Sequence, residues 1–175
     1  MRWILVAILG YVSLVIQTAV FRPGGLAIPI HGHWTRPDLV VIVALFIALY
    51  FQRHEVFIAT WCLGLGADLL SVSGRLGVLA LLYCGLLTVL SAVRSGLNRA
   101  WVLTQSALTF AAVLVIHVGW YMATRYFGGA ETAILRSVEE SALDAAMTAI
   151  LAPYVFWILL RLRGPLGIVV EPYEI

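Results

Sequence analysis

Long apolar runs alternate with short polar links along this chain. A run of about 20 apolar residues is enough to cross the hydrocarbon core of a bilayer as a helix. We therefore predict six membrane-spanning helices, over residues 3–20, 37–53, 54–70, 76–93, 100–123 and 143–160. The links are too short to hold a soluble domain. The pattern thus predicts an all-α integral membrane protein with one six-helix domain over residues 1–175.

The composition agrees with a membrane protein. Hydrophobic residues make up 62% of the chain and charged residues 11%, with a mean hydropathy of +1.00. A soluble domain of this size is far more polar. The basic residues, 11 in all, are arginines that stand singly between apolar runs, which argues against a nucleic-acid-binding surface. Cys62 and Cys84 lie in apolar runs and predict neither a disulfide framework nor a zinc site.

Arginines in the links predict the orientation in the membrane, because cytoplasmic links carry the excess of positive charge. We expect both termini in the cytoplasm, which places slightly more arginines inside than outside. The inside set is Arg2, Arg53, Arg94, Arg99, Arg161 and Arg163, and the outside set is Arg22, Arg36, Arg75, Arg125 and Arg136. Several tryptophans near run ends fit an interfacial aromatic belt. Trp61, in the middle of a run, is expected to pack between helices.

An acid lies near the end of the third apolar run. A charge at the centre of a membrane helix costs about 2.5–3.5 kcal/mol, and less near the helix end, where Asp68 lies. Arg75 lies across a tight turn, so we expect it to pair with Asp68. Gly64 and Gly77 provide a small-residue face and a flexible turn. Three roles stay open for Asp68: a structural acid at the outer turn, docking of a partner, and a proton or substrate site.

Three further ionisable residues lie within or beside the apolar runs. Asp38 follows Pro37, and an acid there suits the positive end of a helix dipole, so we interpret this pair as the first turn of the second helix. His117 stands alone in the fifth run and is expected to form hydrogen bonds between helices. Asp144 opens the sixth run, where a packing role is favoured. Pro153 is expected to kink that helix.

No arrangement of residues in the sequence indicates an enzyme. Ser71 and Ser73 lack the preceding glycine of an intramembrane serine protease. The scattered acids form no metal-binding cluster of the kind that a phosphatidyl transferase needs. His31 and His33 make at most half of a metal site. We therefore expect no catalytic residue, no metal and no cofactor.

Two segments are candidates for contact with partners. Glu131–Leu143 has an apolar face with acidic residues elsewhere, so it forms either an interfacial helix on the outer surface or a plain connector. The tail Gly164–Ile175 is either disordered or adds as a strand to a cytoplasmic partner.

The region from Arg36 to Leu90 carries motifs of a known family. Pro37-Asp38 opens the second helix, the third helix ends in Gly-x-x-x-Asp-Leu, and Leu-Gly-x-x-Ala-Leu opens the fourth. These motifs, with the chain length and short tails, resemble the rod shape-determining protein MreD family. The chain departs from the common pattern in having no lysine and a histidine-containing first link.

The resemblance implies a non-enzymatic subunit of the bacterial cell-wall elongation complex, in the inner (cytoplasmic) membrane and with no nucleic-acid partner. Such proteins bind MreC and act with the glycosyltransferase RodA, a class B penicillin-binding protein, the actin-like MreB and membrane lipids. We expect a hairpin that is structural or binds a partner, formed by Asp38, Gly64, Asp68, Arg75 and Gly77.

The family's fold is similar to that of the substrate-binding membrane subunits, the S components, of energy-coupling-factor vitamin transporters. That similarity implies a rival function, a small-molecule transport subunit. Such a subunit needs polar groups that converge on a ligand cavity. The sequence offers five candidates, namely Gln17, Asp68, Gln105, His117 and Asp144.

Overall fold

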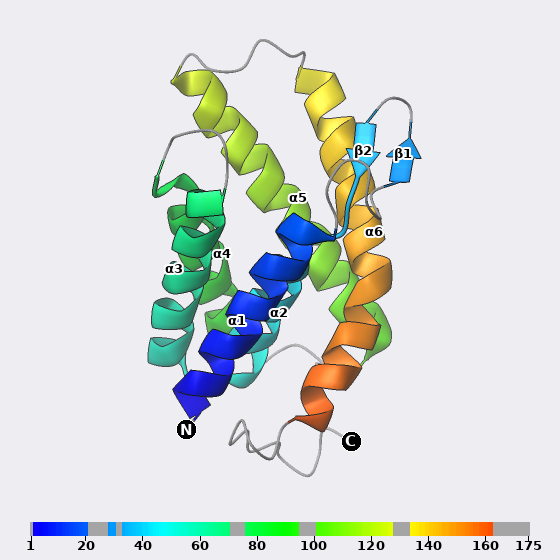
Figure 1. Ribbon diagram of the computed structural model, residues 1–175. Coiled ribbons are helices and arrows are strands. Elements are labelled where there is room, and N and C mark those ends of the chain that lie inside the picture. The colour runs from blue at the N-terminus through cyan, green and yellow to red at the C-terminus, as the bar shows by residue number, and fades with distance from the viewer. Residues whose placement is uncertain are drawn as a thin grey trace.

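The computed structural model describes residues 2–20, 28–30, 33–70, 76–94, 101–127 and 134–162. These residues form six helices and one hairpin of two short strands (Figure 1). The elements in chain order are α1 (Arg2–Ala19), β1 (Ile28–Ile30), β2 (His33–Thr35), α2 (Leu39–Tyr50), α3 (Arg53–Leu70), α4 (Val78–Val93), α5 (Val102–Tyr126) and α6 (Ile134–Arg161). The beginning of α1 and the end of α6 lie at the same end of the bundle (Figure 1).

Most helices begin and end close to the predicted positions. For α1 to α5 the bounds differ from the predicted segments by at most three residues. The exception is α6, which begins at Ile134 rather than at residue 143. The predicted interfacial helix is therefore not a separate element, because from Ile134 onward it forms the first turns of α6. A single helix persists here since no glycine or proline occurs between Ile134 and Pro153, and α6 continues through Pro153.

A short β-hairpin, which the apolar pattern did not predict, precedes α2. β1 pairs antiparallel with β2, with Ile28 opposite Thr35 and Ile30 opposite His33. Strands of three residues are too short to show an alternation of apolar and polar positions. β2 packs against α6, so the hairpin brings the chain to the start of α2 beside α6. His31, which was considered with His33 as half of a metal site, lies outside the described residues.

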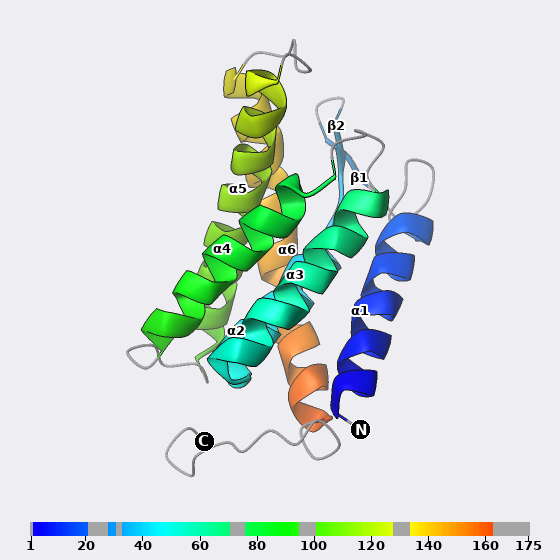
Figure 2. The same ribbon diagram turned by 90° about the vertical axis from the view of Figure 1, so that its left-hand side faces the viewer.

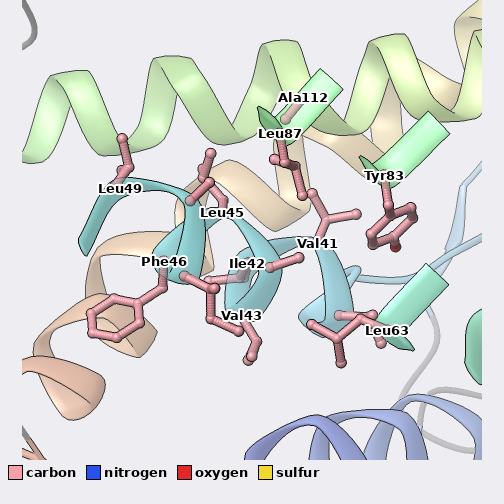
Figure 3. Close-up of a cluster of buried hydrophobic side chains, with 14 of the residues drawn as sticks. Val41, Ile42, Val43, Leu45, Phe46, Leu49, Leu63, Tyr83, Leu87 and Ala112 are labelled. Atoms are coloured by element: carbon pink, nitrogen blue, oxygen red, sulfur yellow. The ribbon is translucent and has the colours of Figure 1, made fainter. Parts of the chain in front are cut away.

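The short helix α2 lies at the centre of the bundle. It packs against the other five described helices, and its residues Val40–Leu49 are buried. A helix that is apolar all round belongs in a core. Figure 3 shows its side chains against Leu63 of α3, Leu87 of α4 and Ala112 of α5. The apolar composition of α2 is thus explained by contact with protein on all sides.

The helices α3 and α4 run side by side as a tightly packed hairpin (Figures 1 and 2). Gly64 permits their close approach, because a Cβ atom added there would lie 2.5 Å from the Cα atom of Ala80. Small residues let helix backbones approach closely in membranes. Trp61 lies on the outer side of α3 and is 36% exposed, so the expectation that it packs between helices is wrong.

The helices differ greatly in length. At 1.5 Å per residue, α2 is about 18 Å long and α6 about 42 Å. Among the described helices, only α5 and most of α6 are long and apolar enough to cross a membrane by length and composition. These two helices pack together and extend past the ends of α3 and α4 (Figures 1 and 2). The projection lies at the end of the bundle that carries the β-hairpin.

Replacing Gly64 by alanine tests the close approach of α3 and α4. The new Cβ would meet the backbone of Ala80, which cannot rotate away, so the two helices would have to separate. We expect the free energy of unfolding to fall by about 1–3 kcal/mol. Denaturant titration of the purified protein in detergent micelles measures this loss.

Gly85→Ala in α4 is the matched control, because nothing lies within 4 Å of a Cβ atom added at Gly85. Alanine also has the higher helix propensity, so this variant should be as stable as the wild type or slightly more stable. Equal stability of the two variants would contradict the packing role of Gly64.

Candidate functional site

The first turn of α2 is buried and begins at an aspartate. Asp38 is the N-cap residue, and its Oδ1 accepts a hydrogen bond from the backbone N–H of Val41 at 3.1 Å. An N-cap carboxylate satisfies an N–H group that has no partner within the helix. The helix therefore begins at Leu39, and Pro37 precedes the cap instead of lying in the first turn as predicted.

Two other helices supply acceptors at the same place. Gln17 of α1 accepts a hydrogen bond from the N–H of Val40 through Oε1, at 3.2 Å. Thr148 of α6 accepts from the N–H of Asp38 through Oγ1 at 2.9 Å, and donates to the carbonyl oxygen of Asp144 at 2.6 Å. A buried N–H without a partner costs about 1–3 kcal/mol. Side chains of α1 and α6 thus hold the start of α2 in place.

His117 of α5 lies between two carboxylates. Its Nε2 is 3.3 Å from Oδ2 of Asp38, and its Nδ1 is 3.9 Å from Oδ2 of Asp144 on α6. Asp144 also accepts a hydrogen bond from the backbone N–H of Arg36, at 3.1 Å. Both aspartates are buried, while the histidine side chain is 27% exposed. We call Asp38, His117 and Asp144 the histidine cluster. It connects α2, α5 and α6.

Asp68, near the C-terminal end of α3, caps the first turn of α4. Its carboxylate accepts hydrogen bonds from the N–H groups of Gly77 at 2.9 Å, Leu79 at 3.2 Å and Ala80 at 3.1 Å. Asp68 is 2% exposed, so these bonds satisfy both the buried carboxylate and the start of α4. Arg75, which was predicted to pair with Asp68, lies outside the described residues.

Gly77 is the residue at which the α3–α4 turn needs glycine. Its φ angle is +102°, in a region that side-chain-bearing residues rarely adopt. This conformation accompanies the hydrogen bond from its N–H to Asp68. Because nothing lies within 4 Å of an added Cβ atom, the requirement is conformational rather than steric.

An arginine, Arg94, binds the carbonyl groups at the C-terminal end of α2. The sequence indicates for this residue only a role in membrane orientation. Arg94, at the end of α4, donates through Nη1 to the carbonyl oxygens of Ala48 at 3.3 Å, Leu49 at 3.4 Å and Phe51. The last carbonyls of a helix lack partners within it, and a cation suits the negative end of its dipole. These contacts join residues 43 to 46 positions apart, so no local pattern could have revealed them.

The candidate residues are divided between separate places in the structure. Asp38 lies in the histidine cluster and not in the α3–α4 hairpin to which the sequence motifs assigned it. Gln105 is buried in α5, twelve residues before His117 and so about 18 Å along the helix. Of the five residues considered for a transport ligand, Gln17, His117 and Asp144 gather near the start of α2. No group of three His, Cys, Asp or Glu side chains within the described ranges could hold a metal ion.

Comparison with protein families identifies the chain. The model of the rod shape-determining protein MreD matches residues 1–163. The chain belongs to the MreD family. The match covers all the helices described above, so the central helix α2 and both capped turns lie within the family's sequence. MreD proteins are non-enzymatic integral membrane proteins of the rod-shape complex and determine cell shape. No curated protein and no solved structure matches the chain.

Replacing Asp68 by alanine tests its capping role in this MreD-family chain. The change removes three hydrogen bonds at the start of α4, and we expect the free energy of unfolding to fall by about 1–3 kcal/mol in a denaturant titration. Asp68→Asn retains one acceptor oxygen and should lose less. Wild-type stability of Asp68→Ala would rule out a stabilising cap by Asp68.

Arg94→Met tests the contact that closes the far end of α2. Methionine keeps an apolar stem but leaves the carbonyls of Ala48, Leu49 and Phe51 without the guanidinium. We expect faster amide exchange in the last turn of α2 and a loss of about 1–3 kcal/mol in unfolding free energy. Arg161→Met is the control, because Arg161 is exposed at the end of α6 and lies over the ring of Trp157. Unchanged exchange in Arg94→Met would contradict the assignment.

Proposed function

We propose that this protein is the non-enzymatic adaptor of the complex that elongates the bacterial cell wall. The match to the MreD family over residues 1–163 is the observation that carries the proposal. The contacts of Asp38, Asp68 and Arg94 support it, because these side chains bond to the backbone of the protein's own helices. Polar residues used in this way build a rigid bundle, and rigid surfaces suit the docking of other proteins.

MreC is the direct partner in this proposal. Through it the protein is linked to RodA, a class B penicillin-binding protein and the MreB filament, with lipids around the bundle. We place all six helices in the bacterial inner membrane as one domain, with both termini in the cytoplasm. The described arginines favour this orientation. Arg2, Arg53, Arg94 and Arg161 lie at the end of the bundle where α1 begins, whereas Arg36, Arg125 and Arg136 lie toward the opposite end.

The α3–α4 hairpin is the docking element that we favour. Gly64 sets the spacing of the two helices and Asp68 holds their turn, so the pair forms a rigid unit. The outer face of α3 exposes three large apolar side chains within about one helical turn, namely Phe57, Ile58 and Trp61. A transmembrane helix of a partner can pack against such a face, because helix association in lipid depends on close packing.

The alternative function is a transport subunit with a fold similar to an S component. Gln17, His117 and Asp144 lie together near the start of α2. This arrangement favours a transport subunit, because such a subunit needs polar groups that converge on a ligand. However, oxygens of Gln17 and Asp144 already accept hydrogen bonds from the backbone N–H groups of Val40 and Arg36. These polar atoms serve the fold, and we therefore retain the adaptor as the proposed function.

Affinity purification from native membranes in a mild detergent tests the adaptor function. We expect mass spectrometry to identify MreC and a penicillin-binding protein with the wild-type chain. The double variant Phe57→Ala/Trp61→Ala should retain several-fold less MreC, because it removes the apolar side chains of the proposed docking face. The matched control is Tyr154→Ala/Trp157→Ala, which removes two exposed aromatic residues from α6.

The possible outcomes separate the functions. Recovery of ATPase subunits or of a bound small molecule in place of MreC would overturn the adaptor and favour a transport subunit. If the Phe57/Trp61 variant retained MreC and the α6 control lost it, the docking face would be assigned to α6 instead of α3.

A further inference from the structure

One imidazole ring connects three helices at the start of α2. His117 of α5 faces Asp38 with one ring nitrogen and Asp144 of α6 with the other. Asp38 uses Oδ1 to cap α2 and Oδ2 to face the ring. The same carboxylate therefore caps the central helix and contacts the histidine. The protonation state of the ring consequently affects the start of α2.

The charge of an imidazole decides how many carboxylates it can bind. A neutral ring has one N–H group and one bare nitrogen, whereas the imidazolium donates from both nitrogens. A bare nitrogen opposite a carboxylate places two lone pairs against each other. With nitrogen–oxygen distances of 3.3 Å and 3.9 Å to the two aspartates, only the protonated ring attracts both in their ionised form. Histidine is the side chain that ordinarily changes charge between pH 5 and 8.

We propose that His117 is a proton-operated clamp at the start of α2. When the ring takes up a proton, it binds Asp38 and Asp144 together and ties α5 to both α2 and α6. When the proton leaves, the attraction to one of the carboxylates is lost. The segment before α2 is then held by the N–H bonds of Arg36 and Asp38 to Asp144 and Thr148. This clamp is independent of the proposed function, because it needs no partner.

The groups around the ring come from each element packed against α5. Among the described residues, α2 contributes Asp38 and α6 contributes Asp144. The buried Tyr83 of α4 interacts electrostatically with Asp38. Carboxylates and phenols ordinarily titrate outside the range from pH 5 to 8. A pH-dependent difference in stability between the wild type and His117→Gln within that range is therefore assigned to the histidine cluster.

Charged residues further along α5 and α6 have partners of their own. Arg125, two turns after His117, contacts the hydroxyl of Tyr121 at 3.5 Å. Glu140, one turn before Asp144, pairs with Arg136 at 3.0 Å. The side chain of Arg36 is exposed, and its backbone N–H is the group that reaches Asp144.

The clamp acts inside the bundle, where α5 and α6 pack against the start of α2. Its release loosens the contact between the start of α2 and this helix pair, while Arg94 still holds the other end of α2. The packing of α5 and α6 against the start of α2 thereby depends on the proton concentration that reaches His117, whose side chain is partly exposed.

Unfolding equilibria measured between pH 5.5 and 8 test the clamp. The wild type, His117→Gln and His54→Gln are titrated with denaturant in detergent micelles. Protonation of His117 stabilises the folded cluster. Its contribution to the free energy of unfolding is therefore present at low pH and lost as the pH rises. We expect the ratio of the wild-type to the His117→Gln folding constant to rise about tenfold from pH 8 to pH 5.5. His54 is exposed at the start of α3. The ratio of the wild-type to the His54→Gln folding constant should therefore stay constant over this pH range.

A wild-type to His117→Gln ratio that is independent of pH would overturn the clamp. If His117→Gln does not fold, nitrogen-15 NMR of histidine-labelled wild-type protein decides the matter. Variants of the other three histidines assign the signals by elimination. We expect both ring nitrogens of His117 to become protonated as the pH falls from 8 to 5.5. A ring that stays neutral down to pH 5.5 would contradict the proposal.

Discussion

Both ends of α2 lie inside the bundle, so their backbone groups must find partners on other helices. A helix end in water is solvated, but in an apolar interior each unpaired N–H or C=O group is costly. Asp38 and Gln17 close the first turn, and Arg94 closes the last. Gln17 and Arg94 thereby fix the positions of α1 and α4 around α2, because a different placement of either helix would leave a buried backbone group unpaired.

The apolar runs predict the bounds of α1 to α5 to within three residues, but they place the start of α6 at residue 143 instead of Ile134. The Pro37-Asp38 motif predicts that α2 begins in this region, although the helix starts only at Leu39, after the cap. Neither predicts the contacts that organise the bundle. Asp38 and His117 are 79 residues apart. Gln17, in the apolar α1, gives no sign of its bond to α2. Arg94 was interpreted through the charge rule for membrane links, which concerns orientation and not packing. Tertiary contacts of this kind depend on the relative rotation of helices, which periodicity does not specify.

Asp68 illustrates a partial success. A structural acid at the α3–α4 turn is one of the three roles that its position leaves open, and the structure places a capping carboxylate there. The sequence rule for N-caps looks within three residues of the helix start. Asp68 instead lies nine to twelve residues before the N–H groups that it caps, on the previous helix. Its bonds to the backbone could be recognised only after α3 and α4 were seen side by side.

The difference in length between α2 and α6 has a consequence for the surrounding bilayer. A lipid-facing helix of about 18 Å would be too short for a hydrocarbon core of about 30 Å, and the bilayer would have to thin around it. Because α2 is enclosed by the other helices, lipid does not meet its ends. Hydrophobic mismatch is therefore set by the outer helices. An insertion or deletion in α2 would disturb the interior of the protein and leave the membrane thickness that it prefers unchanged.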